Sequence, residues 1–366
     1  MQRFLVLGVG NAQVDILNYL KGNFELHACS FALEGRGIEL CDYFELIDIL
    51  NIDLLIKYCQ TKRMDFVYSV GSDIAMPTIS KVSEVLDMPC FTSYQTSLSC
   101  NSKNMFREKL KNTRGAVRFQ NILSANPESL NLPLPLMIKP NNSQGQRGVS
   151  LINSYDGLDK AYFAAKKHSR DGSVIAEEYI AGQEISVNTF IHKGAIIFFI
   201  LSDRISWLGS TSGAIHKHLL PCSLNSTAQD NVIKLVKGVI KTLGIDNGPA
   251  YFQIKIEGEM PRLIEVTPRL DGCHLWRLIK ISTGVDLLGM TIESLTKGKV
   301  SPINATSVSN QWTLEFFCAP PNTTMDINNF SVHPNCVYHE FYYNDGELVK
   351  EINGYMEKCG YQIFRR

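Results

Sequence analysis

The stretch Gln253-Ile-Lys-Ile-Glu-Gly-Glu-Met-Pro-Arg-Leu-Ile-Glu-Val-Thr-Pro-Arg269 carries the most informative pattern in this chain. It predicts two antiparallel strands, at residues 251–256 and 262–266, joined by a turn. Such a pair would present Gln253 and Glu265 on one face, where both offer oxygen ligands suited to Mg²⁺. Arg269, just beyond, can stabilise negative charge on a phosphoryl group or a carboxylate. Taken alone, a surface hairpin with a salt bridge explains this stretch equally well.

Further toward the N-terminus, a strand at residues 136–139 ends in Lys139-Pro140 and leads into the glycine-containing loop Ser143–Gly148. A lysine at a strand end and a loop of this kind can hold phosphate oxygens through charge and backbone N–H groups. The Walker A pattern GxxxxGK[ST] is absent. An exposed hairpin is the stronger interpretation of this segment by itself.

A strand at residues 174–180 carries Glu177 and Glu178 and is followed by Gly182-Gln-Glu184. A carboxylate beside the backbone groups of a strand edge can recognise adenine, and Glu184 can accept hydrogen bonds from ribose hydroxyls. Paired acids at a strand end are more often simply solvated.

His216 and His218 lie in a basic segment that could contact phosphates. Their spacing could also suggest zinc, but the sequence shows no third ligand at a recognisable spacing. No GxSxG elbow or Ser/His/Asp order is present, so a hydrolase with an activated serine is unsupported.

The first hundred residues alternate short apolar strands and helices, which predicts a parallel sheet with helices on both faces. Gly8-Val-Gly10 lies at a strand-to-helix turn, but position 13 is Gln and the full GxGxxG pattern is missing. We therefore do not predict a dinucleotide site there. The last sixty-odd residues are mostly strand-like and are expected to form a small sheet of their own.

Composition mainly excludes classes of partner. The 366 residues contain 36 Lys+Arg and 36 Asp+Glu, and the zero net charge argues against nucleic acid or an anionic membrane surface as a partner. No apolar run is long enough to span a membrane, and no signal peptide is evident. The ten Cys are scattered singly, as in a reduced cytoplasmic protein, which is the location we expect.

The order of these motifs along the chain resembles the ATP-grasp superfamily, from Phe4 to about Leu288. Within it, the chain is similar to the branch of the carbamoyl-phosphate synthase large subunit and biotin carboxylase. The resemblance implies an α/β fold with an N-terminal parallel βα domain over residues 1–98. An ATP-grasp domain would follow over residues 99–300, with a mobile lid at about 115–178. Residues 301–366 carry no match and are expected to be a small β-rich extension.

The resemblance also implies roles for individual residues. ATP phosphates would be contacted by Lys103, Lys139, His216 and the lid loop with Ser143, Gly145, Arg147 and Gly148. The adenosine would be bound by Glu177, Glu178, Ile180 and Glu184. Gln253 and Glu265 would hold Mg²⁺, for which Mn²⁺ could substitute. Arg269 and Lys139 would be the catalytic residues, with Arg269 steadying an acyl phosphate.

One position departs from the family pattern. Relatives carry Glu-x-Asn-Pro-Arg, in which the Asn is a further metal ligand, whereas this chain has Thr267 there. A hydroxyl is a weaker ligand, so Thr267 is a doubtful member of the metal set. A nucleotide-binding relative with weak or no turnover is therefore the alternative to an active enzyme.

The activity implied is ADP-forming ligation of a carboxylate to an amine, with an amino acid or a sugar acid as substrate. Asp73, Arg204, Asp271 and His274 are our guesses for residues that line the substrate site. We expect small-molecule partners and leave a homodimer open. The sequence names neither the acid nor the amine.

Overall fold

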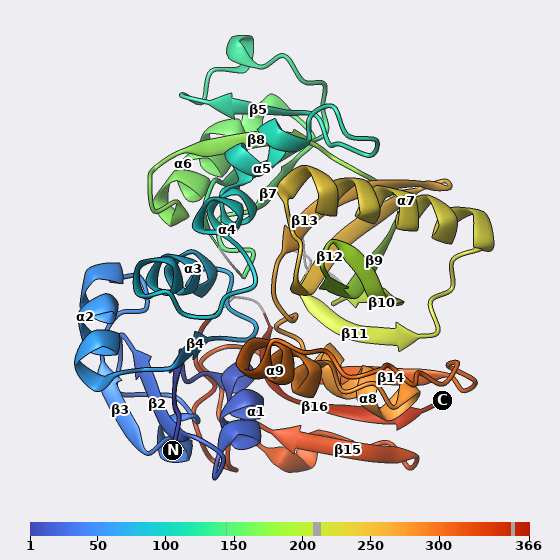
Figure 1. Ribbon diagram of the computed structural model, residues 1–366. Helices are drawn as coiled ribbons and strands as arrows, with labels where there is room; N and C mark the ends of the chain where they lie inside the picture. Colours follow the sequence, from blue (N-terminus) through green and yellow to red (C-terminus); the bar gives the residue numbers. More distant parts are fainter. Residues whose placement is uncertain (144, 208–213, 353–355) are drawn as a thin grey trace.

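The computed structural model describes residues 1–143, 145–207, 214–352 and 356–366, and these form three sheets with their helices (Figure 1). The mixed α/β fold expected from the sequence is confirmed. The domain boundaries at residues 98 and 300 stay predictions.

The N-terminal unit is a four-stranded parallel sheet in the order β3-β2-β1-β4. Its strands are β1 (Arg3–Leu7), β2 (Glu25–Ser30), β3 (Tyr43–Leu46) and β4 (Phe66–Tyr68). Its helices are α1 (Asn11–Leu20), α2 (Ile52–Lys62) and α3 (Ala75–Leu86). Helix α3 carries Pro77 in its first turn, where no backbone N–H is needed.

Two short helices, α4 (Tyr94–Asn101) and α5 (Lys103–Leu110), lead from this unit to a four-stranded antiparallel sheet. Its order is β5-β8-β6-β7. The strands are β5 (Phe119–Ile122), β6 (Leu136–Pro140), β7 (Ser150–Ile152) and β8 (Val174–Glu178), with α6 (Leu158–His168) packed on them. The hairpin expected around Lys139 is the pair β6–β7.

The largest sheet has eight strands in the order β13-β12-β9-β10-β11-β14-β16-β15. Five strands come from the centre of the chain: β9 (Gln183–His192), β10 (Ala195–Ser206), β11 (Ile215–Leu220), β12 (Gly248–Glu257) and β13 (Met260–Thr267). Three come from its end: β14 (Trp312–Ala319), β15 (Cys336–Phe341) and β16 (Glu357–Arg365). The associated helices are α7 (Ser226–Leu243), α8 (Leu275–Thr283) and α9 (Leu287–Lys297).

The C-terminal strands correct one expectation, because they form no separate sheet within the described residues. β14 pairs antiparallel with β11 and thereby joins the central sheet. The sequence pattern of a strand does not identify the strand with which it pairs. Only the three-dimensional structure shows that β14 pairs with β11. As a result, the extension reaches the site described below.

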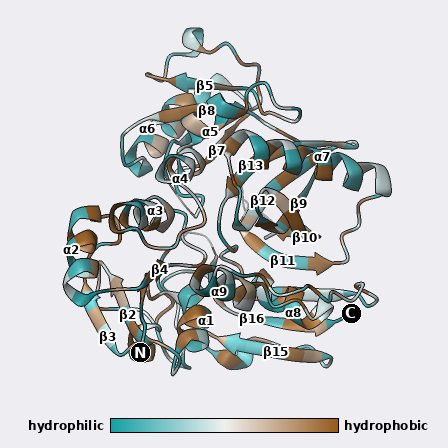
Figure 2. Ribbon diagram, viewed as in Figure 1, coloured by the Kyte–Doolittle hydropathy of each residue, from teal (hydrophilic) through white to brown (hydrophobic). Residues whose placement is uncertain are grey.

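Helix α7 illustrates how the core is built. Asn225 caps its first turn by accepting from the backbone N–H of Ala228, and Gly244 ends it in the left-handed region at φ +68°. Its apolar face, including Val232, Val236 and Val239, is buried against the central strands. Figure 2 shows α7 carrying both hydrophobic and hydrophilic residues, as expected for a helix that covers one face of a sheet.

None of the described helices is both long enough and apolar enough to cross a membrane. Short 3₁₀ turns lie in the connections, at Ile38–Leu40, Pro127–Ser129, Tyr155–Gly157 and Ile327–Asn329.

Candidate active site

A cavity of about 570 Å³ is lined by residues of three parts of the fold. These are the antiparallel sheet β5-β8-β6-β7, the eight-stranded central sheet, and the segment around Asp73 that follows β4. It is large enough for a small-molecule ligand. Most of the residues singled out in the sequence line it: Asp73, Lys103, Lys139, Ser143, Gly145, Arg147, Glu177, Glu178, Ile180, Glu184, Arg204, Gln253, Glu265, Arg269 and Asp271. The fold thus gathers, in one place, side chains that lie up to about two hundred positions apart in the chain.

One wall carries the two lysines expected to meet phosphates. Lys139 ends β6, and its Nζ donates to a carboxylate oxygen of Glu177 at 2.6 Å. Lys103 begins α5, where its backbone N–H donates to the carbonyl of Asn141 and its Nζ to the carbonyl of Ser143 at 3.3 Å. Burial lowers the pKa of Lys103, and Glu265 opposes that shift. The α5 terminus is therefore fastened to the segment after β6, which keeps the two lysines near each other.

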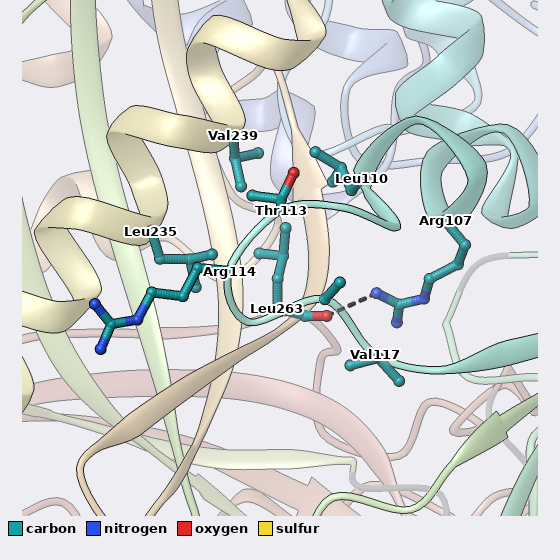
Figure 3. Close-up of a pocket in the computed structure, with 9 residues that line it drawn as sticks. Arg107, Leu110, Thr113, Arg114, Val117, Leu235, Val239 and Leu263 are labelled. Atoms are coloured by element: carbon teal, nitrogen blue, oxygen red, sulfur yellow. Dashed lines mark hydrogen bonds between the residues drawn. The ribbon is translucent and has the colours of Figure 1, made fainter.

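Glu177 is the centre of a buried ion-pair network. Arg107 donates to both its carboxylate oxygens, at 2.7 and 3.1 Å, and Glu177 and Arg107 are almost fully buried. Arg107 also donates to the carbonyl of Leu263 on β13, at 2.7 Å (Figure 3). Burial alone would raise the pKa of Glu177, but Arg107 and Lys139 outweigh it and hold that pKa well below its usual range. Glu177 therefore stays ionised and positions Lys139.

Figure 3 shows the neighbourhood of Arg107, where apolar side chains of α7 and β13 surround a second, much smaller void. That void holds about 10 Å³, room for no more than one water.

The β12–β13 pair carries the expected metal ligands. Gln253 and Glu265 are direct cross-strand partners in the β12–β13 register, as the sequence predicts. The amide nitrogen of Gln253 donates to Glu184, which leaves its amide oxygen as the atom available to a ligand. Within the described residues, the Glu265 carboxylate has no hydrogen-bond or ion-pair partner. Burial raises the pKa of Glu265, Asp73 raises it further, and Lys103 and Arg269 oppose the shift.

These atoms fit a divalent cation. Thr267 lies two positions after Glu265, so both are on one strand face, and its buried Oγ1 has no partner among the described residues. An unpaired carboxylate, an amide oxygen and an orphaned hydroxyl are the donors that Mg²⁺ takes in proteins. Gln253 and Glu265 could hold such an ion, whereas Thr267 does not itself line the cavity.

Arg269 is held in place by Asp73, which follows β4 of the N-terminal unit. Its Nε donates to Asp73 at 2.8 Å and its guanidinium also donates to the carbonyl of Leu270. The two segments touch closely at Gly71, which has φ +66°, and an added Cβ there would lie 2.9 Å from the Cα of Gly272. The glycine thus permits a backbone contact that brings Asp73 to Arg269.

The strand edge expected to bind adenine lines the cavity, its role in binding stays a prediction, and its carboxylates have protein partners. The Glu178 carboxylate accepts from Arg118 and Arg262, and Glu177 is engaged as described above. Neither carboxylate is free to recognise a base, so only the backbone of residues 178–180 remains for that purpose. Glu184 is likewise engaged by Arg204 and Gln253, although it lines the cavity.

Besides Thr267, three candidates lie off the lining formed by the described residues. His216 contacts Glu315 at 3.4 Å and packs edge-on against Trp207. Gly148 packs against α6. His274 was a guessed substrate residue, but it is buried and bonded to Asp15 of α1 and to the Tyr342 hydroxyl. It joins the N-terminal unit to the C-terminal strands and has a structural role.

Two further lysines line the cavity that were not predicted as site residues from the sequence. Lys255 donates to the carbonyl of Ile180 at 3.0 Å and lies over the ring of Tyr179. Its alternation with Gln253 along β12 was a usable signal, because every second residue of a strand shares a face. Lys358 of β16 had no such signal, since nothing in the sequence pairs β16 with the site.

Comparison with known proteins agrees with this geometry. Residues 132–275 match the family model described as an ATP-grasp domain. Alanine–anticapsin ligase of Bacillus amyloliquefaciens is 24% identical over 188 residues, covering 45% of this chain and 39% of that protein. Carbamoyl phosphate synthase large chain of Pseudomonas putida is 26% identical over 136 residues, covering 37% of this chain and 13% of that protein.

Among solved structures, L-amino acid ligase from Bacillus licheniformis aligns over 100% of this chain and 93% of that chain, with a TM-score of 0.79 and 16% identity. This likeness shows the fold. The chain spans about half the length of the first curated relatives that it matches. The match over residues 132–275 identifies an ATP-grasp domain in this chain, and the likeness to the solved structure extends over the whole fold.

Proposed function

We propose that this chain is an ADP-forming ligase, which activates a carboxylate as an acyl phosphate and joins it to an amine. The observation that carries the proposal is the arrangement of one cavity. It is lined by Lys103 and Lys139 from α5 and β6, by Gln253 and Glu265 from the β12–β13 pair, and by Arg269 just after β13. This is the distribution of charge that ATP phosphates, a divalent cation and a second anion would need. The named relatives, which are ligases, support the same class of reaction.

In the proposed first step, a carboxylate oxygen of the substrate attacks the γ-phosphorus of ATP, the bond to the bridging oxygen breaks, and ADP leaves. Lys139, held by Glu177, and Lys103 would bind the phosphate oxygens. Gln253 and Glu265 would hold Mg²⁺, which supplies charge neutralisation of the phosphates when bound. Arg269, fixed by Asp73, would stabilise the acyl phosphate.

In the second step, the amine nitrogen attacks the acyl carbon, the bond to the phosphate oxygen breaks, and inorganic phosphate leaves. The amine gives up a proton, which passes to solvent or phosphate. The protein needs no covalent nucleophile for either step, and its contribution is positioning and charge neutralisation.

The proposal is tested by incubating the protein with ATP, Mg²⁺ and a panel of acids, with hydroxylamine as the trapping nucleophile. An acyl phosphate would yield a hydroxamate together with equimolar ADP and phosphate. Nucleotide binding without ADP formation for any acid would instead support the alternative, a binding protein weakened at Thr267. The absence of both nucleotide binding and turnover would contradict both.

Replacing Lys139 with Met is expected to raise the dissociation constant of ATP about 10- to 100-fold, because a charge-assisted contact to phosphate is lost. Calorimetric titration in the presence of Mg²⁺ measures the change. Lys160→Met, an exposed position on α6 of the same unit, is the matched control and should bind ATP as the wild type does. Equal affinity in Lys139→Met would remove Lys139 from the phosphate site.

A further inference from the structure

One end of the cavity is built by the C-terminal extension. Cys318 of β14 and Lys358 of β16 are cross-strand partners there, and Met356 lies just before β16. The Nζ of Lys358 lies 3.9 Å from the ring centroid of Phe316 and 3.3 Å from Sγ of Cys273. The lysine is therefore held at the wall by a ring and a thiol.

The charge of Lys358 has no counter-ion in the described part of the chain. Lys139, Arg204 and Arg269 each contact a carboxylate, namely Glu177, Glu184 and Asp73. Lys103 and Lys255 donate to the backbone carbonyls of Ser143 and Ile180. For Lys358, no carboxylate lies within 4 Å of Nζ among the residues that the structure describes. A half-buried ammonium group without a partner is costly, and a bound anion would offset that cost.

His218 adds a second observation. It is fully buried on β11, directly opposite Arg204 in the β10–β11 register, and its Nε2 has no hydrogen-bond partner among the described residues. Ligand atoms of His218, Asp271 and Cys273 lie within 4.8 Å of one another. Asp271 and Cys273 line the cavity, and the fully buried His218 lies directly behind them.

The surrounding charges indicate the sign of a ligand that this end of the cavity would bind. A metal cation at His218, Asp271 and Cys273 would meet Lys358, which already contacts Cys273, and Arg204 beside His218. Burial first, and then Arg204 and Lys358, hold the pKa of His218 well below its ordinary value. The ring is therefore neutral and can donate one N–H. A lysine and a neutral histidine suit an anion better than a cation.

We propose that Lys358 binds a carboxylate of the substrate other than the one that is activated. This inference rests on the proposed ligase function and adds a substrate class to it. The second carboxylate could belong to the acid, as in a dicarboxylate, or to the amine, as in an amino acid. In either case the C-terminal extension determines specificity.

The test compares wild type, Lys358→Met and Lys350→Met. Lys350 lies in the same extension but is exposed and paired with Glu34, so it is the matched control. Two sets of compound pairs are used: amino acids with their amides, and succinate or glutarate with their monoamides. Phosphate release gives kcat and KM, and calorimetry with a non-hydrolysable ATP analogue and Mg²⁺ gives binding without turnover.

We expect wild type and Lys350→Met to prefer the carboxylate-bearing member of one set by about 10- to 100-fold in kcat/KM. Lys358→Met should lose that preference through a higher KM, with the ATP dissociation constant unchanged. The set that shows the effect identifies whether the acid or the amine carries the group.

Retention of the preference in Lys358→Met would overturn the inference. So would one zinc ion per purified chain that disappears in His218→Ala, because a resident cation would then occupy the cluster. If wild type releases no phosphate with any pair, the proposed function fails. Calorimetry still decides the role of Lys358 in that case: a carboxylate compound bound by wild type and not by Lys358→Met supports it, and equal binding or none overturns it.

Discussion

Glu265→Gln is expected to lower kcat by at least about 100-fold while leaving the fold intact. The substitution keeps the shape of the side chain but removes the carboxylate that has no protein partner among the described residues and faces the lysines across the cavity. Losing a charged metal ligand weakens both binding of the ion and stabilisation of the transition state. Steady-state phosphate release measures the loss. Glu257→Gln, at the exposed turn end of the neighbouring strand β12, is the control.

The raised pKa of Glu265 gives this prediction a second readout. Because the group must be ionised to hold the cation, turnover of the wild type should fall as the pH falls through that pKa. A carboxyl whose folded pKa lies above its unfolded value destabilises the fold at higher pH. Without Mg²⁺ and nucleotide, Glu265→Gln at neutral pH should therefore unfold at the same or a higher urea concentration than the wild type. Wild-type turnover in this variant would show that the metal assignment is wrong.

Glu177→Gln is expected to lower the free energy of unfolding by about 3–5 kcal/mol, the usual cost of leaving buried cations unpaired. Arg107 would keep its bonds to backbone carbonyls on β13, but Arg107 and Lys139 would lose their shared carboxylate. Urea unfolding at neutral pH measures the difference. Glu108→Gln, the exposed neighbour of Arg107 on α5, should change stability by no more than about 0.5 kcal/mol.

The pH dependence of the Glu177 effect has a definite sign. The folded pKa of Glu177 is depressed, so its stabilising contribution is present above the unfolded pKa and is lost as the pH falls through the folded pKa. The gap between wild type and Glu177→Gln should therefore be largest near neutral pH and shrink in acid. A gap below about 1 kcal/mol at neutral pH would show that the network contributes little to the fold.

Much of this fold follows from local pattern. The βα alternation of the first hundred residues and the hairpins around Lys139 and Gln253 are confirmed, because alternation and turn residues act over short stretches. The cross-strand pairing of Gln253 with Glu265 is confirmed for the same reason. The sequence also shows that Thr267 replaces the Asn of the family pattern. The structure adds that the Thr267 hydroxyl is buried and has no hydrogen-bond partner among the described residues.

The rest depends on contacts between distant segments. Glu177 was expected to bind adenine because it lies at the end of a strand. The sequence does not indicate that Arg107, seventy positions earlier, donates to its carboxylate. Asp73 reaches Arg269 only because Gly71 and Gly272 touch. Lys358 reaches the cavity only through the pairing of β14 with β11 and of β16 with β14. Short strands do not specify their partners by pattern.

The most direct test of the central claim is a crystal structure of the protein with ADP and Mg²⁺. The account predicts the nucleotide in the 570 Å³ cavity, with its phosphates on Lys103 and Lys139 and the ion on Gln253 and Glu265. A nucleotide bound elsewhere, or an ion that leaves both Gln253 and Glu265 uncoordinated, would contradict it.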